Sequence, residues 1–353
     1  MSLFLVLLLS SMSLCFVFST TCKAGAFSLF FKKQIFGILS GVAIYFLCSF
    51  IDYRTICRTG YWLYLFTLGL LMFTLIKGSI GMGAQRWINL GFVKFQSSEL
   101  AKLFFPMFIT YYFLHDTEQT EPKPITYGIP LIVIGLSFIL VLKQPDLGTG
   151  LIILFSGSLM LWFTGLQTKF FMIAGLCVLI TAPISWHILK PYQKKRILVF
   201  LGQGDRNKER YQIEQSKIAV GSGGILGKGI GKGTQNKMCF LPESRTDFIF
   251  SVICEETGFV GAMIVIILYI LLFFQLLGMI LTITSFYPKL MCFGLLAPIV
   301  FSTMINIGMV LGLMPIVGIP LPFMSYGITH IWTGFASLGC INSVTCQRYA
   351  QDM

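Results

Sequence analysis

The strongest constraint on this chain is a series of apolar runs, each long enough to cross a membrane as a helix. A bilayer core about 30 Å thick needs roughly 20 apolar helical residues per crossing. Backbone in contact with lipid must pair its own peptide groups, so each run is expected to be helical. The runs lie at 3–21, 34–51, 61–80, 98–114, 126–142, 149–166, 170–189, 248–277, 290–312 and 325–346. The sequence therefore predicts an all-α integral membrane protein with about ten transmembrane helices.

The charge content supports lipid-facing surfaces. Only 11% of the 353 residues are charged and 56% are hydrophobic, whereas soluble domains are about a quarter charged. The first run has neither a basic segment before it nor a small-residue cleavage site, so it is expected to be retained as a helix. With no internal repeat and no soluble domain at either end, residues 1–353 are expected to form a single polytopic membrane domain.

The stretch 190–247 interrupts the apolar pattern. It is rich in Lys, Arg, Gly and Gln, and it cannot cross the bilayer because lipid would leave its irregular backbone unpaired. A loop of this length is usually functional. Two shorter segments, 81–96 and 312–322, are also expected to be irregular. The short loops on the two sides of the membrane carry nearly equal numbers of basic residues, so the charge bias does not decide the orientation.

The net charge of +12 is typical of a membrane protein that contacts anionic lipid. Nucleic-acid binding is not expected, since no basic helix or aromatic-basic module lies outside the apolar runs. The ten cysteines are scattered without a CxxC pair, and most lie in apolar runs, where Cys behaves as a small hydrophobe. Neither a metal site nor a disulfide framework is predicted from them.

The densest group of charged residues closes the long loop, at 241–250 (LPESRTDFIF). Glu243, Arg245 and Asp247 stand just before an apolar run. A carboxylate in this position could act as a general base on a substrate hydroxyl. Alternatively, Thr246 or Asp247 could cap the helix that follows. The motif alone favours the cap, and the two roles can coexist.

Two further pairs of charges lie inside apolar runs. Glu99 and Lys102, in SSELAK, are three residues apart and share a helical face. Charges in a membrane helix are costly, so the pair is expected either to face a cavity or to form a self-satisfied ion pair. Glu255 and Glu256 lie roughly 12 Å or more along a helix from Asp247. They are expected to be structural or cavity-lining rather than paired with that residue.

Polar residues also flank the shorter loops. Asp146, in KQPDLGTG (143–150), is expected to cap the sixth run or to line a cavity, and the cap is favoured. Arg86, in GAQRWINLGF (83–92), could hold a phosphate through its forked guanidinium. Its neighbour Trp87 is expected to be an interfacial anchor.

The glycine-rich segment 221–233 (GSGGILGKGIGKG) lacks the preceding strand and the spacing of a phosphate-binding loop, which excludes nucleotide binding. Lys228 and Lys232 are expected to lie near lipid headgroups or a pyrophosphate. His115, His187 and His330 show no ligand spacing and are expected to be ordinary interfacial residues.

Five segments, taken together and in order, resemble the RodA branch of the SEDS (shape, elongation, division and sporulation) family. They are RWINLGFVKFQSSELAK (86–102), KQPDLGTG (143–150), YQIEQSKIAVGSGGILGKG (211–229), FLPESRTDFIFSVICEETGFVG (240–261) and GLMPIVGIPLPFMSYG (312–327). The resemblance covers nearly the whole chain. One departure follows SYG (325–327), where the family usually has Gly-Ser and this chain has ITH (328–330).

The resemblance implies both termini in the cytoplasm and the long loop outside the bacterial cytoplasmic membrane. The implied reaction is polymerisation of the lipid-linked disaccharide lipid II into peptidoglycan strands during cell elongation. Asp247 matches the family's essential acidic residue, which would act as base on the acceptor 4-hydroxyl while undecaprenyl pyrophosphate leaves. The implied partner is a class B penicillin-binding protein, a transpeptidase.

The resemblance also implies which side chains meet the substrate. Lys102 is expected near Asp247, where a cation would lower the carboxylate pKa. The sequence assigns no cofactor and leaves a metal requirement open: a divalent cation such as Mg²⁺ could bridge the pyrophosphate, but no dedicated ligand cage is found. The residues expected to contact the substrate are Lys102, Glu99, Arg86, Arg245, Glu243, Asp146, Lys195, Arg196 and Ser325.

Two other functions are compatible with such a chain: a lipid II flippase, and a non-catalytic scaffold of a cell-wall synthase complex. An alternating-access carrier should place its polar residues near the midplane, in related halves. Here the charges gather around the long loop and no repeat is present. This distribution favours the enzyme.

Overall fold

Every predicted span corresponds to a helix. The computed structural model describes residues 1–21, 28–81, 84–89, 91, 94–116, 124–188, 191–203, 210–238 and 240–351. The fold class predicted from the apolar runs, a helical integral membrane protein, is confirmed. The helices that match the spans are α1 (Ser2–Thr21), α2 (Leu29–Phe50), α3 (Tyr53–Lys77), α4 (Ser97–Asp116), α5 (Gly128–Lys143), α6 (Leu147–Phe163), α7 (Thr168–Ile188), α11 (Ile249–Leu281), α12 (Phe286–Val310) and α13 (Ile328–Gln351).

Not all of these helices are equally apolar. Within the described residues, six segments are long and apolar enough to span a bilayer: α1, α2, α3, α11, α12, and α5 together with the 3₁₀ turn η1 (Pro124–Tyr127). The apolar helices at 147–163 and 168–181 are shorter. The start of α4 carries Glu99 and Lys102, which lowers its hydropathy. The chain is a multi-pass membrane protein whose polar helices are shielded by neighbouring ones.

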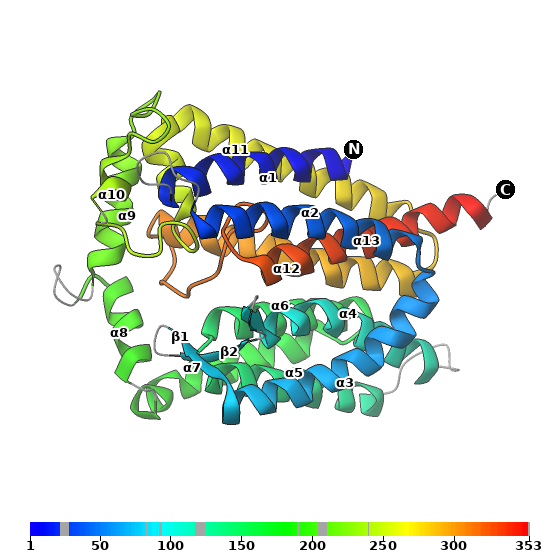
Figure 1. Ribbon diagram of the computed structural model, residues 1–353. Coiled ribbons are helices and arrows are strands. Elements are labelled where there is room, and N and C mark those ends of the chain that lie inside the picture. Colours follow the sequence, from blue (N-terminus) through cyan, green and yellow to red (C-terminus); the bar gives the residue numbers. More distant parts are fainter. Residues whose placement is uncertain are drawn as a thin grey trace.

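The helices form two packed groups (Figure 1). One core is built mainly by α1, α2, α11, α12 and α13, and its large buried side chains include Tyr269 and Phe335. The second core is built mainly by α3, α4, α5 and α6, around Tyr64 and Phe105. Helix α4 packs against both α3 and α12, so it joins the two groups. Both chain ends lie at the end of the bundle opposite the long loop, as an even number of crossings requires.

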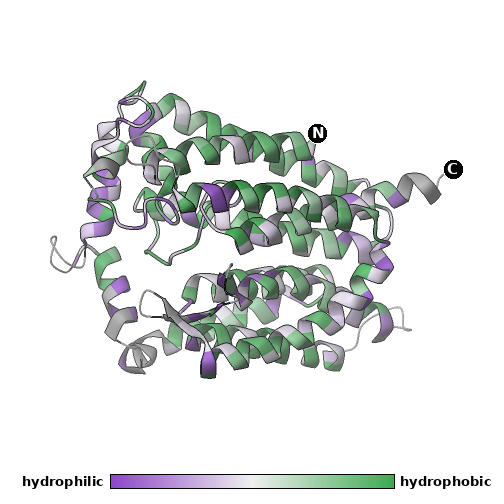
Figure 2. Cartoon of the chain, viewed as in Figure 1, coloured by the Kyte–Doolittle hydropathy of each residue, from purple (hydrophilic) through white to green (hydrophobic). Residues whose placement is uncertain are grey.

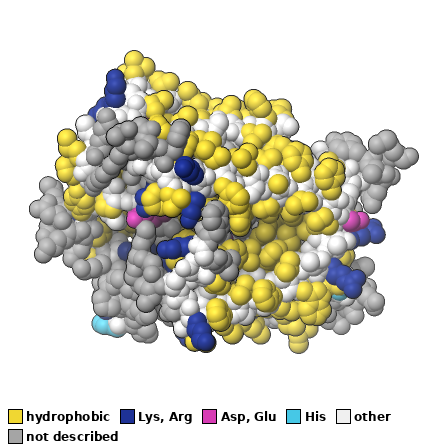
Figure 3. Space-filling model, in the orientation of Figure 1, with side chains coloured by type: hydrophobic (Ala, Val, Ile, Leu, Met, Phe, Trp, Pro, Cys, Tyr) yellow, Lys and Arg dark blue, Asp and Glu magenta, His cyan; other side chains and the backbone are white. Residues whose placement is uncertain are grey.

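The outer surface is apolar along the helices. Figure 2 shows hydrophobic residues along most of their length, with hydrophilic ones mainly toward the ends. In the space-filling view, hydrophobic side chains cover most of the middle of the visible face (Figure 3). Large side chains such as Leu39 and Phe66 are 68% and 63% exposed. Apolar exposure on this scale is unfavourable in water, and it fits a surface that faces lipid.

The long loop is more regular than predicted. It contains α8 (Pro191–Phe200), α9 (Tyr211–Ser222) and the short α10 (Thr234–Lys237), which lie along one end of the bundle in Figure 1. In α9, Ser216 Oγ donates a hydrogen bond to Val310 O at 2.9 Å and lies 2.8 Å from Ser251 Oγ. Tertiary contacts of this kind stabilise α9, so a search for apolar runs does not detect it.

The segment preceding α4 also differs from the prediction. The segment predicted to be irregular instead contributes to a three-stranded antiparallel sheet, made of β1 (Ser79–Gly81), β2 (Ala84–Asn89) and β3 (Lys94–Gln96). Trp87 in the central strand pairs with Ser79 on one side and Gln96 on the other. Strand pairing satisfies backbone groups that have few other partners at the membrane boundary.

Helix α11 is interrupted at Gly258, whose φ of 68° and ψ of −163° are not helical. This combination of angles is essentially restricted to glycine. The glycine-rich segment 221–233 packs against the interruption, where the backbones approach closely. A Cβ on Gly223 would lie 1.9 Å from Cys254 O, and one on Gly227 would lie 2.2 Å from Glu256 O. The glycines therefore serve close backbone packing.

This contact repairs the hydrogen bonds that the interrupted helix loses. Backbone N–H groups of the glycine-rich segment donate to carbonyls of α11, and N–H groups of α11 donate to carbonyls of the segment. One lysine side chain adds a further bond, and all these distances are 2.8–3.1 Å. The bonds run from Lys228 N to Glu255 O (3.0 Å), Gly229 N to Glu256 O (2.9 Å), Phe259 N to Gly224 O (2.9 Å), Val260 N to Ile225 O (3.1 Å) and Lys228 Nζ to Glu255 Oε1 (2.8 Å).

The two adjacent glutamates of α11 are structural, as predicted. Glu255 Oε1 also accepts hydrogen bonds from Thr234 N and Thr234 Oγ1, at 2.8 and 2.9 Å. Glu256 accepts one from Ser19 in α1. Lys228 pairs with the buried carboxylate of Glu255 at 2.8 Å, and its expected place near a headgroup or pyrophosphate stays a prediction.

We predict that Gly258→Ala strongly destabilises the protein. The backbone conformation alone costs about 1–3 kcal/mol for a residue with a Cβ, and that Cβ would lie 2.3 Å from Gly227 N. Gly278→Ala in the same helix is the matched control, because a Cβ there meets no atom within 4 Å among the described residues. Thermal unfolding in detergent should show a large fall in Tm for the first variant only. Equal Tm values for the two would contradict the packing described above.

Candidate active site

A cavity of about 280 Å³ lies where the two helix groups meet, at the long-loop end of the bundle. Its wall combines residues of β2, β3, α4, α6, α8, α9 and α13 with non-helical residues in 243–248, 316–320 and 326–327. Segments remote in sequence therefore converge on one space. Of the residues predicted to contact substrate or to catalyse, those on the wall are Arg86, Glu99, Arg196, Glu243 and Asp247.

Asp247 immediately precedes α11 without capping it. The N-cap residue is Phe248, and no side chain caps the helix. The capping alternative is therefore wrong for both Thr246 and Asp247. Thr246 Oγ1 instead donates to Glu243 O at 3.3 Å and to Glu243 Oε2 at 3.2 Å. The Asp247 carboxylate is left to face the cavity.

The surroundings of Asp247 make its carboxylate more basic. Burial raises the pKa of Asp247 from its ordinary value of 3.8 to about 6, and the negative charges of Glu243 and Asp146 act in the same direction. The guanidinium groups of Arg86 and Arg196 partly oppose that rise in pKa. A base whose pKa lies near the operating pH accepts a proton more effectively than an ordinary Asp.

The backbone of Asp247 is held by a residue that the sequence analysis missed. Asn306, fully buried in α12, donates from Nδ2 to Asp247 O at 2.8 Å and to Ile319 O at 2.7 Å. One carboxamide thus joins the 241–250 segment to the proline-rich segment 312–322. The available signal was an Asn within an apolar run, since polar residues in membrane helices are usually functional.

Ser325 also positions this segment rather than lining the cavity. Its buried Oγ donates to Thr246 O at 2.6 Å and accepts from Leu321 N at 2.8 Å. Next to it, Tyr326 N donates to Arg245 O at 2.9 Å. The structure therefore gives Ser325 a supporting role in place of the predicted substrate contact.

Arg86 and Asp146 connect β2 to the α5–α6 turn. Arg86 Nε donates to Gln144 O at 2.9 Å, a second guanidinium nitrogen donates to Pro145 O, and a third lies 3.9 Å from Asp146 Oδ1. Asp146 caps α6 by accepting from Thr149 N at 3.2 Å, which confirms the favoured alternative. Arg86 lines the cavity while two of its N–H groups donate to carbonyls of the turn, so its guanidinium contributes both to the turn and to the cavity wall.

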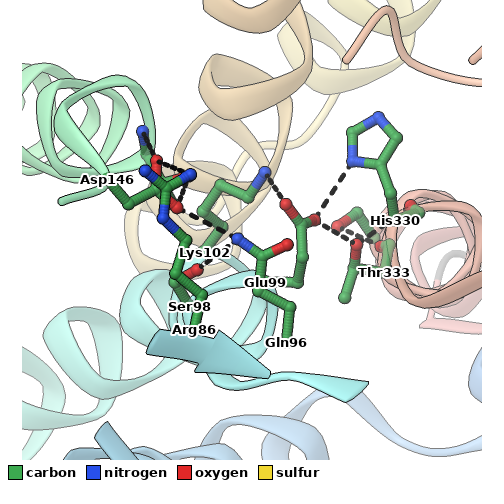
Figure 4. Close-up of polar contacts among 10 residues, drawn as sticks. Arg86, Gln96, Ser98, Glu99, Lys102, Asp146, His330 and Thr333 are labelled. Carbon is green, nitrogen blue, oxygen red and sulfur yellow. Dashed lines mark hydrogen bonds and ion pairs between the residues drawn. The ribbon is translucent and has the colours of Figure 1, made fainter. Parts of the chain in front are cut away.

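Glu99 is the centre of a buried polar cluster (Figure 4). Lys102 Nζ lies 2.7 Å from Glu99 Oε1. On the other oxygen, His330 Nδ1 and Thr333 Oγ1 of α13 each lie 3.1 Å from Oε2. The sequence left open whether Glu99 and Lys102 pair with each other or face a cavity. Both are observed, because the two side chains form an ion pair and Glu99 also lines the cavity. The interfacial role expected for His330 is wrong.

Lys102 does not have the predicted relation to Asp247. Its ammonium pairs with Glu99, and the charges that shift the Asp247 pKa come from other residues. Arg245 is also placed differently: its guanidinium carbon lies 3.9 Å from the centre of the Phe30 ring, a cation–π contact. The side chain of Lys195 lies outside the described residues.

The whole chain matches a known family. The family model of the FtsW/RodA/SpoVE cell cycle proteins matches residues 1–350. The peptidoglycan glycosyltransferase MrdB of Escherichia coli (strain K12) is 37% identical, over 90% of this chain and 86% of its own length.

The chain belongs to the FtsW/RodA/SpoVE family.

Other members agree in extent and in fold. Stage V sporulation protein E of Bacillus subtilis (strain 168) is 32% identical over 98% of this chain and 96% of its own. One similar solved structure is that of a peptidoglycan synthase complex, described as coordinating polymerization and crosslinking. A chain of that complex matches with a TM-score of 0.83 and 28% identity, and the match covers 99% of this chain and 97% of the other. The rod shape determining protein RodA of Thermus thermophilus has a TM-score of 0.73 at 26% identity, covering 99% and 96%.

These comparisons confirm the resemblance drawn from the five sequence segments. They also show that the departure at 328–330 leaves the fold of this family member unchanged, since the structural match covers 99% of the chain. What the departure changes is local: His330 takes part in the Glu99 cluster.

We predict that Lys102→Met lowers the free energy of unfolding by about 3 kcal/mol, because it leaves the buried Glu99 carboxylate without its cation. The double variant Lys102→Met/Glu99→Gln should recover part of the loss, since it removes both charges. Tm values in detergent for the wild type and both variants test this. A single variant as stable as the wild type would show that the pair contributes nothing.

Proposed function

We propose that this protein is a peptidoglycan glycosyltransferase of the bacterial cytoplasmic membrane. It transfers the growing glycan strand from its undecaprenyl pyrophosphate carrier onto the 4-hydroxyl of a lipid II acceptor during cell elongation. The observation that carries the proposal is the Asp247 carboxylate, raised in pKa and facing a cavity of about 280 Å³ at the end of a membrane bundle. Relatives that are named peptidoglycan glycosyltransferases support it.

In the proposed reaction, the Asp247 carboxylate removes the proton from the acceptor 4-hydroxyl. The oxygen attacks the anomeric carbon of the donor strand and forms the new glycosidic bond. The bond from that carbon to the pyrophosphate breaks, and undecaprenyl pyrophosphate leaves with the electron pair. Attack opposite to the leaving group inverts the anomeric centre. Arg86 and Arg196 on the cavity wall supply positive charge that favours an anionic pyrophosphate.

A divalent cation such as Mg²⁺ would supply further positive charge beside the anionic pyrophosphate. Mg²⁺ is usually held by one or two carboxylates together with substrate phosphates. Glu243, which lines the cavity beside Asp247, fits this need. Among the described residues no group of three or more side chains suited to holding a metal is found, so the substrate phosphates would complete the site.

The proposed partner is a class B penicillin-binding protein, a transpeptidase that cross-links the strands. The support is the similarity to a chain of a peptidoglycan synthase complex. The long loop is proposed to lie outside the membrane, where its basic residues would attract the pyrophosphate lipid. The Glu99–Lys102 pair lies next to the cavity at the same end of the bundle, a one-sided arrangement that favours the enzyme over a carrier.

The decisive experiment measures strand polymerisation from purified lipid II by the protein with its transpeptidase partner. We expect long strands from the wild type and none from Asp247→Asn, which cannot accept the proton but keeps the size of the side chain. Partner binding and Tm of the variant serve as controls for folding. A wild type that makes no strands but moves labelled lipid II across a vesicle bilayer would instead establish a flippase.

We also predict an acidic limb in the pH dependence of kcat/KM with a midpoint near 6. Asp247 must be deprotonated to act as base, so activity should fall as the pH drops through its pKa of about 6.

Two variants test that the midpoint belongs to Asp247. Glu243→Gln removes a negative charge that raises the Asp247 pKa, so the midpoint should move to lower pH. Arg196→Gln removes a positive charge that lowers this pKa, so the midpoint should move to higher pH. Absolute activity will fall in both, and only the midpoints are compared. Movement in the same direction would exclude Asp247 as the titrating base.

A further inference from the structure

His330 stands between two cavities. Its imidazole lines the cavity of about 280 Å³ that contains Asp247, and it also lines a smaller one of about 30 Å³. Glu99 lines both cavities as well. The His330 side chain is 11% exposed. A histidine in this position forms part of the wall of the proposed active site.

One edge of the imidazole is fixed by Glu99. A carboxylate only accepts hydrogen bonds, so the nitrogen that lies 3.1 Å from Glu99 Oε2, His330 Nδ1, carries the hydrogen. In the neutral ring this tautomer leaves a lone pair on Nε2. Lys102 already balances the charge of Glu99, at 2.7 Å. The bond to Glu99 fixes the orientation of the imidazole ring.

The other edge of the ring is unused. His330 Nε2 is buried and has no hydrogen-bond partner among the residues that the structure describes. In the close-up it points away from Glu99 (Figure 4). A buried polar atom without a partner is unfavourable, and a ligand that supplies the missing hydrogen bond gains that free energy on binding. In the tautomer that donates from Nδ1, an unprotonated Nε2 accepts a hydrogen bond, which a sugar hydroxyl or an amide N–H can donate and a phosphate oxygen cannot.

We propose that His330 is a substrate-binding residue whose Nε2 accepts a hydrogen bond from a hydroxyl or amide N–H of the lipid-linked saccharide. This inference rests on the proposed function, because it names a contact to the substrate of that reaction. Asp247 provides the base, and His330 provides a buried nitrogen without a partner among the described residues, on the wall of the same cavity. Glu99 holds the ring, and Lys102 and Thr333 hold Glu99.

Two substitutions separate the two ring nitrogens. Asn places its amide near the position of Nδ1, so His330→Asn can keep the bond to Glu99 while it loses Nε2. Gln reaches the position of Nε2, so His330→Gln keeps a polar group there while it loses the bond to Glu99. Thr333→Val is the matched control, because it removes another hydrogen bond to Glu99 without touching Nε2.

The measurements are KM and kcat for strand polymerisation from purified lipid II, with Tm as a check on folding. Equilibrium binding of lipid II to each variant in an Asp247→Asn background measures affinity without turnover. For His330→Asn we expect KM and the binding constant to weaken about tenfold, the cost of one lost hydrogen bond. The kcat should change less than KM, and Tm should stay near that of the wild type. His330→Gln should lose less affinity, and Thr333→Val least.

Wild-type affinity in His330→Asn, with a loss confined to His330→Gln and Thr333→Val, would overturn the proposal and leave His330 as a support for Glu99. That outcome requires an active wild type, so it is distinct from failure of the proposed function. If the wild type makes no strands at all and does not bind lipid II, the function falls and the inference falls with it.

Discussion

Inside a bilayer every backbone N–H and C=O must find its partner within the protein, because hydrocarbon offers none. The regular turns of the long helices meet this requirement on their own. The end of the bundle that holds the cavity contains non-helical segments as well as helices. There, side chains and neighbouring segments supply the missing hydrogen-bond partners of the backbone. The glycine-rich segment 221–233 bonds to the interrupted turn of α11 at Gly258. Asn306 and Ser325 bond to carbonyls of the non-helical segments beside the cavity. Irregular backbone at this depth exists because these bonds satisfy it.

The same bonds determine where the reactive carboxylate lies. Asp247 is presented by a segment whose backbone is tied to α12 through Asn306 and to the SYG segment through Ser325. Its side chain makes no capping hydrogen bond to α11. Its basicity comes from burial and from two neighbouring carboxylates, with two arginines limiting the effect. Structural support and chemical reactivity are thus divided: Asn306 and Ser325 hold the segment, and the Asp247 carboxylate faces the cavity.

The cavity wall has two chemical characters. Both negative and positive side chains surround Asp247, namely Glu243, Asp146, Arg86 and Arg196. This combination suits a site that must deprotonate a hydroxyl and hold an anionic pyrophosphate. At the Glu99 cluster the charges of Glu99 and Lys102 are already paired, and His330 Nε2 has no partner among the described residues. Charged side chains for the reacting groups beside an unpaired polar atom for sugar recognition are a consistent division of roles for a glycosyltransferase.

The sequence by itself determined the helical membrane fold, since apolar runs of bilayer length have few alternatives in lipid. It also identified Asp247, Glu99 and Lys102, because charges are conspicuous at the ends of apolar runs, and the five segments identified the family. Only the tertiary structure decided how these residues are used. Whether Asp247 capped α11, whether Lys102 faced Asp247 or Glu99, and whether His330 was interfacial all depended on packing between α4, α12 and α13. Helix α9 and the role of Asn306 were not predictable for the same reason: they depend on contacts between segments far apart in the chain, which local patterns do not record.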